Sequence, residues 1–163
     1  MLNNLDDSAK LPVLIKAFYS ETNLNVREDI SYAITKMGNI AVSPLSKLLQ
    51  EENPDIRHHA AHVLGKIADG EAIDALINVL DNEHPKVVMK AIIALGQIKD
   101  EKAIPALVNL LGHDNDYIRT TLIDVLEQFG TAIIPLLLDA LKHERWQVRE
   151  QATELLCLVG SKR

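Results

Sequence analysis

The feature that most constrains this chain is a repeat that returns every 30 or 31 residues. Each copy opens with an apolar residue, at Val26, Ile56, Val87, Ile118 and Val148. A fixed period of this length is typical of a solenoid, in which each unit packs on its neighbours. The period therefore predicts a stack of similar units.

Within each unit, two apolar runs have helical spacing. In the unit that opens at Ile56, apolar side chains return at Ala60, Val63, Leu64 and Ile67. This spacing places them on one face of an α-helix. After a short turn, a second helical face follows at Ile73, Leu76, Val79 and Leu80. Each unit is therefore predicted to be a helical hairpin.

These hairpins account for almost the whole chain. We assign full hairpins to residues 25–52, 53–83, 84–114 and 115–144, and half repeats to residues 8–22 and 145–160, which predicts about ten helices. With 163 residues, 47% of them hydrophobic, the chain is expected to form one domain, residues 1–163. The fold prediction is an all-α, right-handed α-solenoid.

Charge and hydropathy restrict the partners and the location. The net charge of −6 opposes binding to a polyanion, so we expect no nucleic-acid partner. The first residues form no basic leader, and the longest apolar stretch, residues 11–19, is far shorter than the ~20 residues that cross a bilayer. We therefore expect a cytoplasmic protein with no membrane partner. The single cysteine, Cys157, excludes an internal disulfide, and its apolar neighbours predict a half-buried structural thiol.

Three segments of the repeat resemble the motif of the short HEAT-like repeats first noted in phycobilisome lyases. Residues 55–57 follow its Asp-x-Val-Arg segment, residues 94–98 its Ala-Leu-Gly-x-Ile segment, and residues 103–107 its Ala-Ile-Pro-Ala-Leu segment. The resemblance covers nearly the whole chain and implies the fold. Proteins with this repeat include scaffolds, lyase subunits, a metal-dependent hydroxylase and DNA repair glycosylases, so the resemblance leaves the activity open.

One repeat position carries Arg27, Arg57, Arg119 and Arg149. Stacked along a solenoid, they would form a ladder that could bind phosphate, whereas the family resemblance implies pairing with the aspartate of an adjacent repeat. In the third hairpin the arginine is replaced by Val88, which Met89 follows. Together with Ile92 or Ile93, this apolar gap is either a protein contact or local packing.

The histidines of the second full hairpin suggest a metal site. Residues 57–61, Arg-His-His-Ala-Ala, resemble the Arg-His-Glu-Ala-Ala stretch of deoxyhypusine hydroxylase, where His-Glu pairs hold two irons. Here His59 replaces the glutamate, and the equivalent pairs elsewhere are not His-Glu, so that di-iron site is not predicted. His58 and His62 lie four residues apart on one helix face, which suits two metal ligands. A looser site with Glu28 and Asp29 stays open, but we expect no cofactor or metal.

The second helices are predicted to line a concave surface that binds a partner. Just after each core leucine on these helices stand Ser46, Lys47, Ile77, Asn78, Val108, Asn109, Leu138 and Asp139. Apolar, amide and charged side chains in one stripe are typical of a protein-binding groove. We therefore predict a non-catalytic scaffold for another protein and assign no catalytic residue. The alternative is a lyase-like or metal-dependent enzyme subunit related to bilin lyases or deoxyhypusine hydroxylase.

The last helix suggests one further contact. It carries Leu155, Leu156, Leu158 and Val159. These residues either mediate self-association through the C-terminal helix or pack onto Ile134, Leu137 and Leu141.

Overall fold

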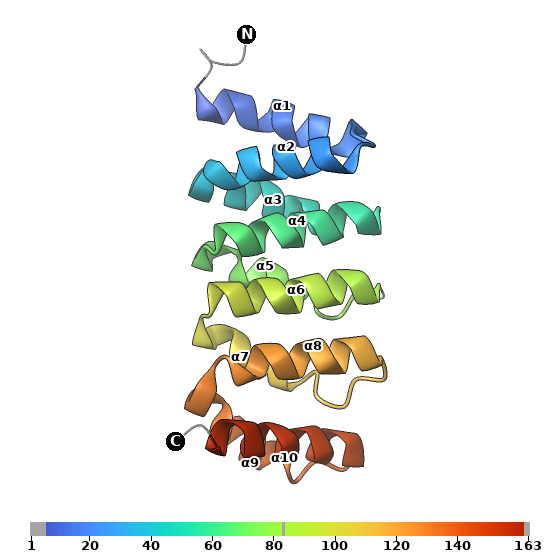
Figure 1. Ribbon diagram of the computed structural model, residues 1–163, viewed down its shortest axis with the longest axis vertical. Coiled ribbons are helices and arrows are strands. Elements are labelled where there is room, and N and C mark those ends of the chain that lie inside the picture. Colours follow the sequence, from blue (N-terminus) through green and yellow to red (C-terminus); the bar gives the residue numbers. More distant parts are fainter. Residues whose placement is uncertain (1–5, 83, 162–163) are drawn as a thin grey trace.

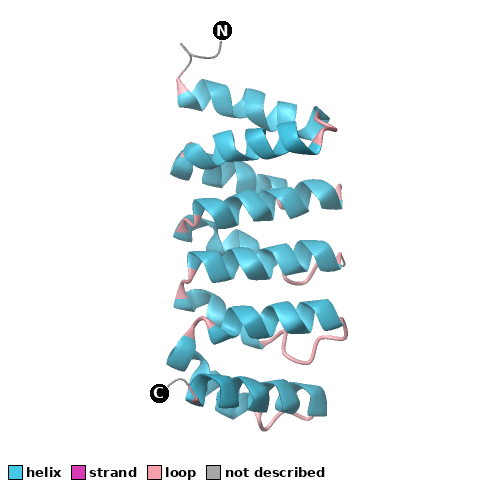
Figure 2. Ribbon diagram, in the orientation of Figure 1, coloured by secondary structure: helices cyan, strands magenta, loops and turns pink. Residues whose placement is uncertain are grey.

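The structure is a computed structural model that describes residues 6–82 and 84–161. These residues form ten α-helices and short 3₁₀ turns, with no strand among them (Figure 2). The helices stack in one direction, and α1 and α10 lie at opposite ends of the stack (Figure 1). The predicted all-α solenoid of about ten helices is confirmed.

The stack has two layers. The first layer holds the long first helix of each hairpin: α2 (Leu24–Lys36), α4 (Pro54–Ile67), α6 (Pro85–Ile98), α8 (Asp116–Glu127) and α10 (Trp146–Gly160). The second layer lies behind it in Figure 1 and holds the short helices α3 (Val42–Leu48), α5 (Ile73–Asn78), α7 (Ile104–Val108) and α9 (Ile134–Ala140). At one end, α1 (Asp7–Ser20) packs on α2. A 3₁₀ turn precedes each second helix: η2 (Gly38–Ala41), η3 (Gly70–Ala72), η4 (Glu101–Ala103) and η5 (Gly130–Ile133).

Asparagine side chains start several of the first helices. Asn53 accepts a hydrogen bond from the backbone N–H of Asp55 at 2.9 Å, and Asn115 accepts one from Tyr117 at 3.0 Å. These side chains satisfy N–H groups that have no partner within the helix. Pro54 follows Asn53 at the first turn, where a missing N–H costs nothing. The link sequence therefore sets where α4 and α8 begin.

The core repeats with the sequence. Leu64, Leu95 and Leu126 occupy one position of consecutive first helices, and each is 0% exposed. Leu76, Leu107 and Leu137 of the second helices are also 0% exposed. Each leucine therefore lies between neighbouring units, as the predicted register requires.

Two positions differ from the sequence prediction. Val26 opens the first full hairpin but is 42% exposed, because α1, rather than another first helix, packs on this side of α2. Cys157 was predicted to be half-buried, and this prediction is wrong: the thiol is exposed. Leu155 and Val159 point into the core from α10, which turns Cys157 to the opposite face of the helix.

Within the described residues, no single helix has the length and apolar character to cross a membrane. One pair, residues 116–127 and 130–140, meets the criterion only when its two segments are taken together, and they are bent by 120°.

Replacing Leu95 with alanine tests the register. Because Leu95 is fully buried between repeats, Leu95→Ala should lower the free energy of unfolding by about 2–5 kcal/mol. The same change at Leu138, which is 51% exposed, should cost less than about 0.5 kcal/mol. Urea denaturation followed by circular dichroism measures both. Equal losses at the two leucines would contradict the assigned core.

Replacing Gly65 with alanine tests the close approach of α4 to α6. A Cβ atom at Gly65 would lie 2.9 Å from the Cα atom of Ala94, so the two backbones would have to separate. We expect Gly65→Ala to destabilise the protein by about 1–3 kcal/mol. Gly160→Ala is the control, because a Cβ atom there meets nothing within 4 Å. Thermal unfolding should show a lower melting temperature for Gly65→Ala alone.

Candidate functional site

The predicted concave stripe lies on the second layer, and we call it the second-helix surface. Its exposed members are Lys47, Asn78, Asn109, Leu138 and Asp139. Ser46 and Ile77 are half-buried. Lys142, on the next turn, forms a 3.0 Å ion pair with Asp139. The surface thus runs from a lysine on α3, past two exposed amides, to an apolar and a charged residue on α9.

Val108 does not belong to this surface, and that part of the prediction is wrong. Its side chain is 8% exposed and is part of the continuous apolar core. The short helix α7 packs against both α8 and α9. Val108 on α7 is therefore covered, whereas Leu138, at the equivalent position of α9, is exposed. A charge at Val108 would therefore disturb folding as well as binding.

A groove of about 440 Å³ lies within the second-helix surface, between α3 and the next hairpin. Ser46 and Lys47 line it from α3. Glu71 and Asp74 line it from η3 and α5. The groove therefore offers donors on one wall and carboxylates on the other.

The arginine ladder closes the links between repeats. Arg57 donates to the carbonyl oxygens of Glu51 and Glu52 at 2.7 and 2.9 Å. Arg149 makes the equivalent bonds to His143 and Glu144, both at 2.7 Å, and Arg119 donates to the carbonyl of His113 at 2.6 Å. These guanidinium groups thus satisfy link carbonyls that the preceding helices leave unpaired. Phosphate would have to compete with these bonds.

The acidic partner of this ladder differs from the family expectation at one position. Arg119 contacts Asp116 of its own helix rather than an aspartate of an adjacent repeat. Arg57 does reach the next link, where it donates to Asn82 at 3.3 Å.

The apolar gap in the ladder is mostly local packing. Val88 and Ile92 are 1% and 0% exposed and belong to the core. Met89 and Ile93 remain half-buried.

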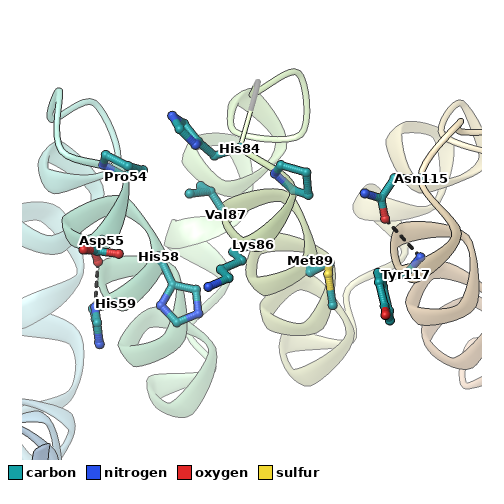
Figure 3. A pocket seen from close by; sticks show the side chains of 11 residues that line it. Pro54, Asp55, His58, His59, His84, Lys86, Val87, Met89, Asn115 and Tyr117 are labelled. Atoms are coloured by element: carbon teal, nitrogen blue, oxygen red, sulfur yellow. Dashed lines mark hydrogen bonds between the residues drawn. The ribbon is translucent and has the colours of Figure 1, made fainter.

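The N-terminal ends of α4, α6 and α8 form a groove that the sequence did not predict, which we call the first-helix groove (Figure 3). Its volume is about 750 Å³. His58 points into it beside Lys86, while Met89 and Tyr117 stand on either side of the gap between α6 and α8 (Figure 3). Tyr117 is 75% exposed, and aromatic residues are enriched in interfaces. Pro54 and Pro85, at the equivalent first turns of α4 and α6, also line this groove.

The candidate metal ligands lie on two neighbouring first helices, with His58 and His62 on α4 and Glu28 and Asp29 on α2. No group of three or more His, Cys, Asp or Glu side chains that could hold a metal ion occurs among the described residues, which include His58, His62, Glu28 and Asp29. Burial, reinforced by neighbouring charges including that of Lys90, lowers the pKa of both imidazoles to about 4. The same lysine charge would repel a cation.

His59 has a packing role. Its Nδ1 donates to the carbonyl of Asp55 at 2.6 Å, and its ring makes an edge contact with Phe18 of α1, with 5.2 Å between centroids. The residue that replaces the expected glutamate therefore joins α4 to α1.

Comparison with known proteins agrees with this geometry. The sequence matches the family of HEAT repeats over residues 42–127 and 104–163, which together cover most of the chain. The chain belongs to the HEAT repeat family. The resemblance noted in the sequence is thereby confirmed, and the matched region begins at α3. No curated protein shows a significant match.

Solved structures share the stacked helical fold. The complex of CpcE and CpcF of phycocyanin lyase from Nostoc sp. PCC7120 is similar over 92% of this chain and 65% of that chain, with 25% identity and a TM-score of 0.63. Human deoxyhypusine hydroxylase in complex with glycerol is similar over 93% of this chain and 63% of that chain, with 18% identity and a TM-score of 0.64. A designed armadillo repeat protein in complex with the peptide (KR)4 is similar over 93% and 82% of the two chains, with 20% identity and a TM-score of 0.54. The chain thus spans less than two thirds of the length of the first two proteins.

The lowered pKa values of His58 and His62 predict a dependence of stability on pH. Between pH 6.5 and about 4, the unfolded chain binds protons at these residues that the folded chain does not. Stability should therefore fall as the pH falls through this window, and this contribution should level off below about pH 4. Urea denaturation from pH 7 to pH 4 should give a smaller loss for His58→Gln/His62→Gln. Circular dichroism at pH 7 should show that the double variant is folded.

Proposed function

We propose that this HEAT repeat protein is a non-catalytic scaffold that binds another protein along the second-helix surface. The observation that carries the proposal is the recurrence of exposed polar side chains at one register of successive second helices, with the exposed Leu138 beside them on α9. A stack with constant spacing turns this register into a continuous row. Such a row can follow an elongated segment of a partner over several repeats.

The chemistry of the row suggests how a partner would be held. Leu138 offers an apolar contact, and the amides of Asn78 and Asn109 can both donate and accept hydrogen bonds. Lys47 stands at the other end of the row from Asp139, so the charge differs between the two ends. An elongated segment of a partner would therefore bind along the row in one preferred chain direction.

The known structures support a protein partner. One is a complex of CpcE with CpcF, and another is a designed repeat protein with a bound peptide. The net charge of −6 and the engagement of the arginines with link carbonyls disfavour nucleic acid. The proposal includes a cytoplasmic location and a single domain with the repeat division predicted from the sequence.

A lyase-like enzyme subunit is a second candidate, favoured by the 25% identity to a chain of the phycocyanin lyase complex. On this hypothesis, the chain would act on a bilin-bearing protein with a second subunit. Bound colour after purification from the native source, or a stoichiometric metal by elemental analysis, would favour this candidate over the scaffold.

Charge substitutions on the second-helix surface test the scaffold. The tagged protein is used to capture a stoichiometric partner from native extract, and the recombinant partner is then titrated by calorimetry. We expect Asn109→Arg/Leu138→Glu to weaken binding by about tenfold or more, since it replaces the exposed apolar contact of the row and one of its amides by charges.

Tyr32→Glu is the matched control, because Tyr32 is 62% exposed but lies on α2 in the first layer. It should bind the partner as the unmodified protein does. Circular dichroism should show that both variants are folded. If Asn109→Arg/Leu138→Glu binds the partner with full affinity, the partner does not bind at the second-helix surface.

A further inference from the structure

A third groove lies at the N-terminal end of the stack, between α1 and α3, and we call it the N-terminal groove. Its volume is about 580 Å³. Leu11, Ile15 and Tyr19 line it from α1, and Ile40 and Leu48 line it from η2 and α3. The spacing of four residues between Leu11, Ile15 and Tyr19 is that of a helix face. Ile40 is 43% exposed, which leaves apolar surface open to solvent.

The charges on this groove have one sign. Lys16 lines it from α1 and Lys47 lines it from α3, and no acidic residue is among its lining side chains. In the described part of the chain, neither lysine forms an ion pair. Two lysines without an ion pair, on opposite walls of an apolar groove, are complementary to apolar side chains flanked by carboxylates.

The side chain of Tyr19 lines the N-terminal groove, but its hydroxyl group is covered. Its hydroxyl oxygen is buried and has no hydrogen-bond partner among the described residues. Burial, followed by the charge of Glu51, raises the pKa of Tyr19 to about 12, so the hydroxyl remains protonated.

We propose that the N-terminal groove binds an amphipathic helix of a partner protein, with apolar side chains between α1 and α3 and carboxylates on Lys16 and Lys47. This inference deepens the proposed scaffold function and rests on it, because Lys47 belongs to both surfaces. A groove between two helices suits a third helix, which presents an apolar ridge with polar residues on both sides. An amphiphile with a single anionic head would satisfy one wall only.

A phage-displayed library of random peptides, selected on the purified full chain, tests the chemistry of the groove. The enriched sequences should combine apolar residues at helical spacing with flanking aspartate or glutamate. The most enriched sequence is then synthesised with a fluorescent label, and its affinity is measured by anisotropy.

A pair of matched variants tests the location. Lys16→Glu/Lys47→Glu should lower the affinity for the peptide by about tenfold or more. Lys99→Glu/Lys102→Glu makes the same change in charge at exposed lysines that line none of the grooves described and should leave the affinity within about twofold. A peptide with lysine at each acidic position should bind Lys16→Glu/Lys47→Glu better than the unmodified protein.

Several results would overturn the proposal. They are the absence of enriched peptides, enriched peptides without acidic residues, and equal losses in the two double variants. Displacement of the peptide by a fatty acid would assign the groove to a lipid. A dimer in light scattering that Lys16→Glu/Lys47→Glu dissociates would assign it to a second copy of the chain.

The N-terminal groove and the proposed function can fail separately. Asn109→Arg/Leu138→Glu lies at the other end of the second layer and should keep full affinity for the selected peptide. If that variant loses the extract partner while the groove binds no acidic peptide, the scaffold stands and the groove assignment falls. If the peptide binds as expected but Asn109→Arg/Leu138→Glu binds the extract partner with unchanged affinity, the second-helix surface is rejected as the binding site and the groove assignment stands.

Discussion

The structure depends on the burial of one repeated apolar face between consecutive hairpins. A single hairpin cannot cover the leucines at its centre, so each unit is completed by the next. Leu64 and Leu95 are fully buried for this reason, and Gly65 lets α4 approach α6 until a Cβ atom would no longer fit. Burial of this kind accounts for most of the helical stability, because helices as short as α5 and α7 are not stable alone.

Side chains of the first helices help to keep the links between hairpins at a constant length. A buried or half-buried arginine of each first helix, except α6, bonds to carbonyls five or six residues earlier in the chain. The third hairpin replaces this polar contact with the buried side chain of Val88. The arginine and the valine occupy the same repeat position, next to the link. A position that could have been a basic ladder is therefore part of the scaffold itself.

The candidate binding surfaces lie where the regular stacking leaves side chains uncovered. On the second layer, the short helices leave the residues after the core leucine in a row. At the N-terminal end, α1 replaces a regular hairpin and meets α3 across a groove rather than a filled interface. The first-helix groove lies at the N-terminal ends of α4 and α6, whereas the close approach at Gly65 lies near the C-terminal end of α4. Candidate binding surfaces therefore arise where neighbouring helices separate.

The sequence alone determined the repeat, the helical hairpins and the leucine core, because these depend on spacing that every copy shares. It also placed Lys47, Asn78, Asn109, Leu138 and Asp139 on the surface, where the structure has them exposed. Only the tertiary structure decided that Val108 is covered and that Cys157 is exposed. It also brought residues of α1 and α3 together into one groove. Periodicity fixes the face of a helix on which a side chain lies, but its exposure depends on how far the neighbouring helices extend over that face.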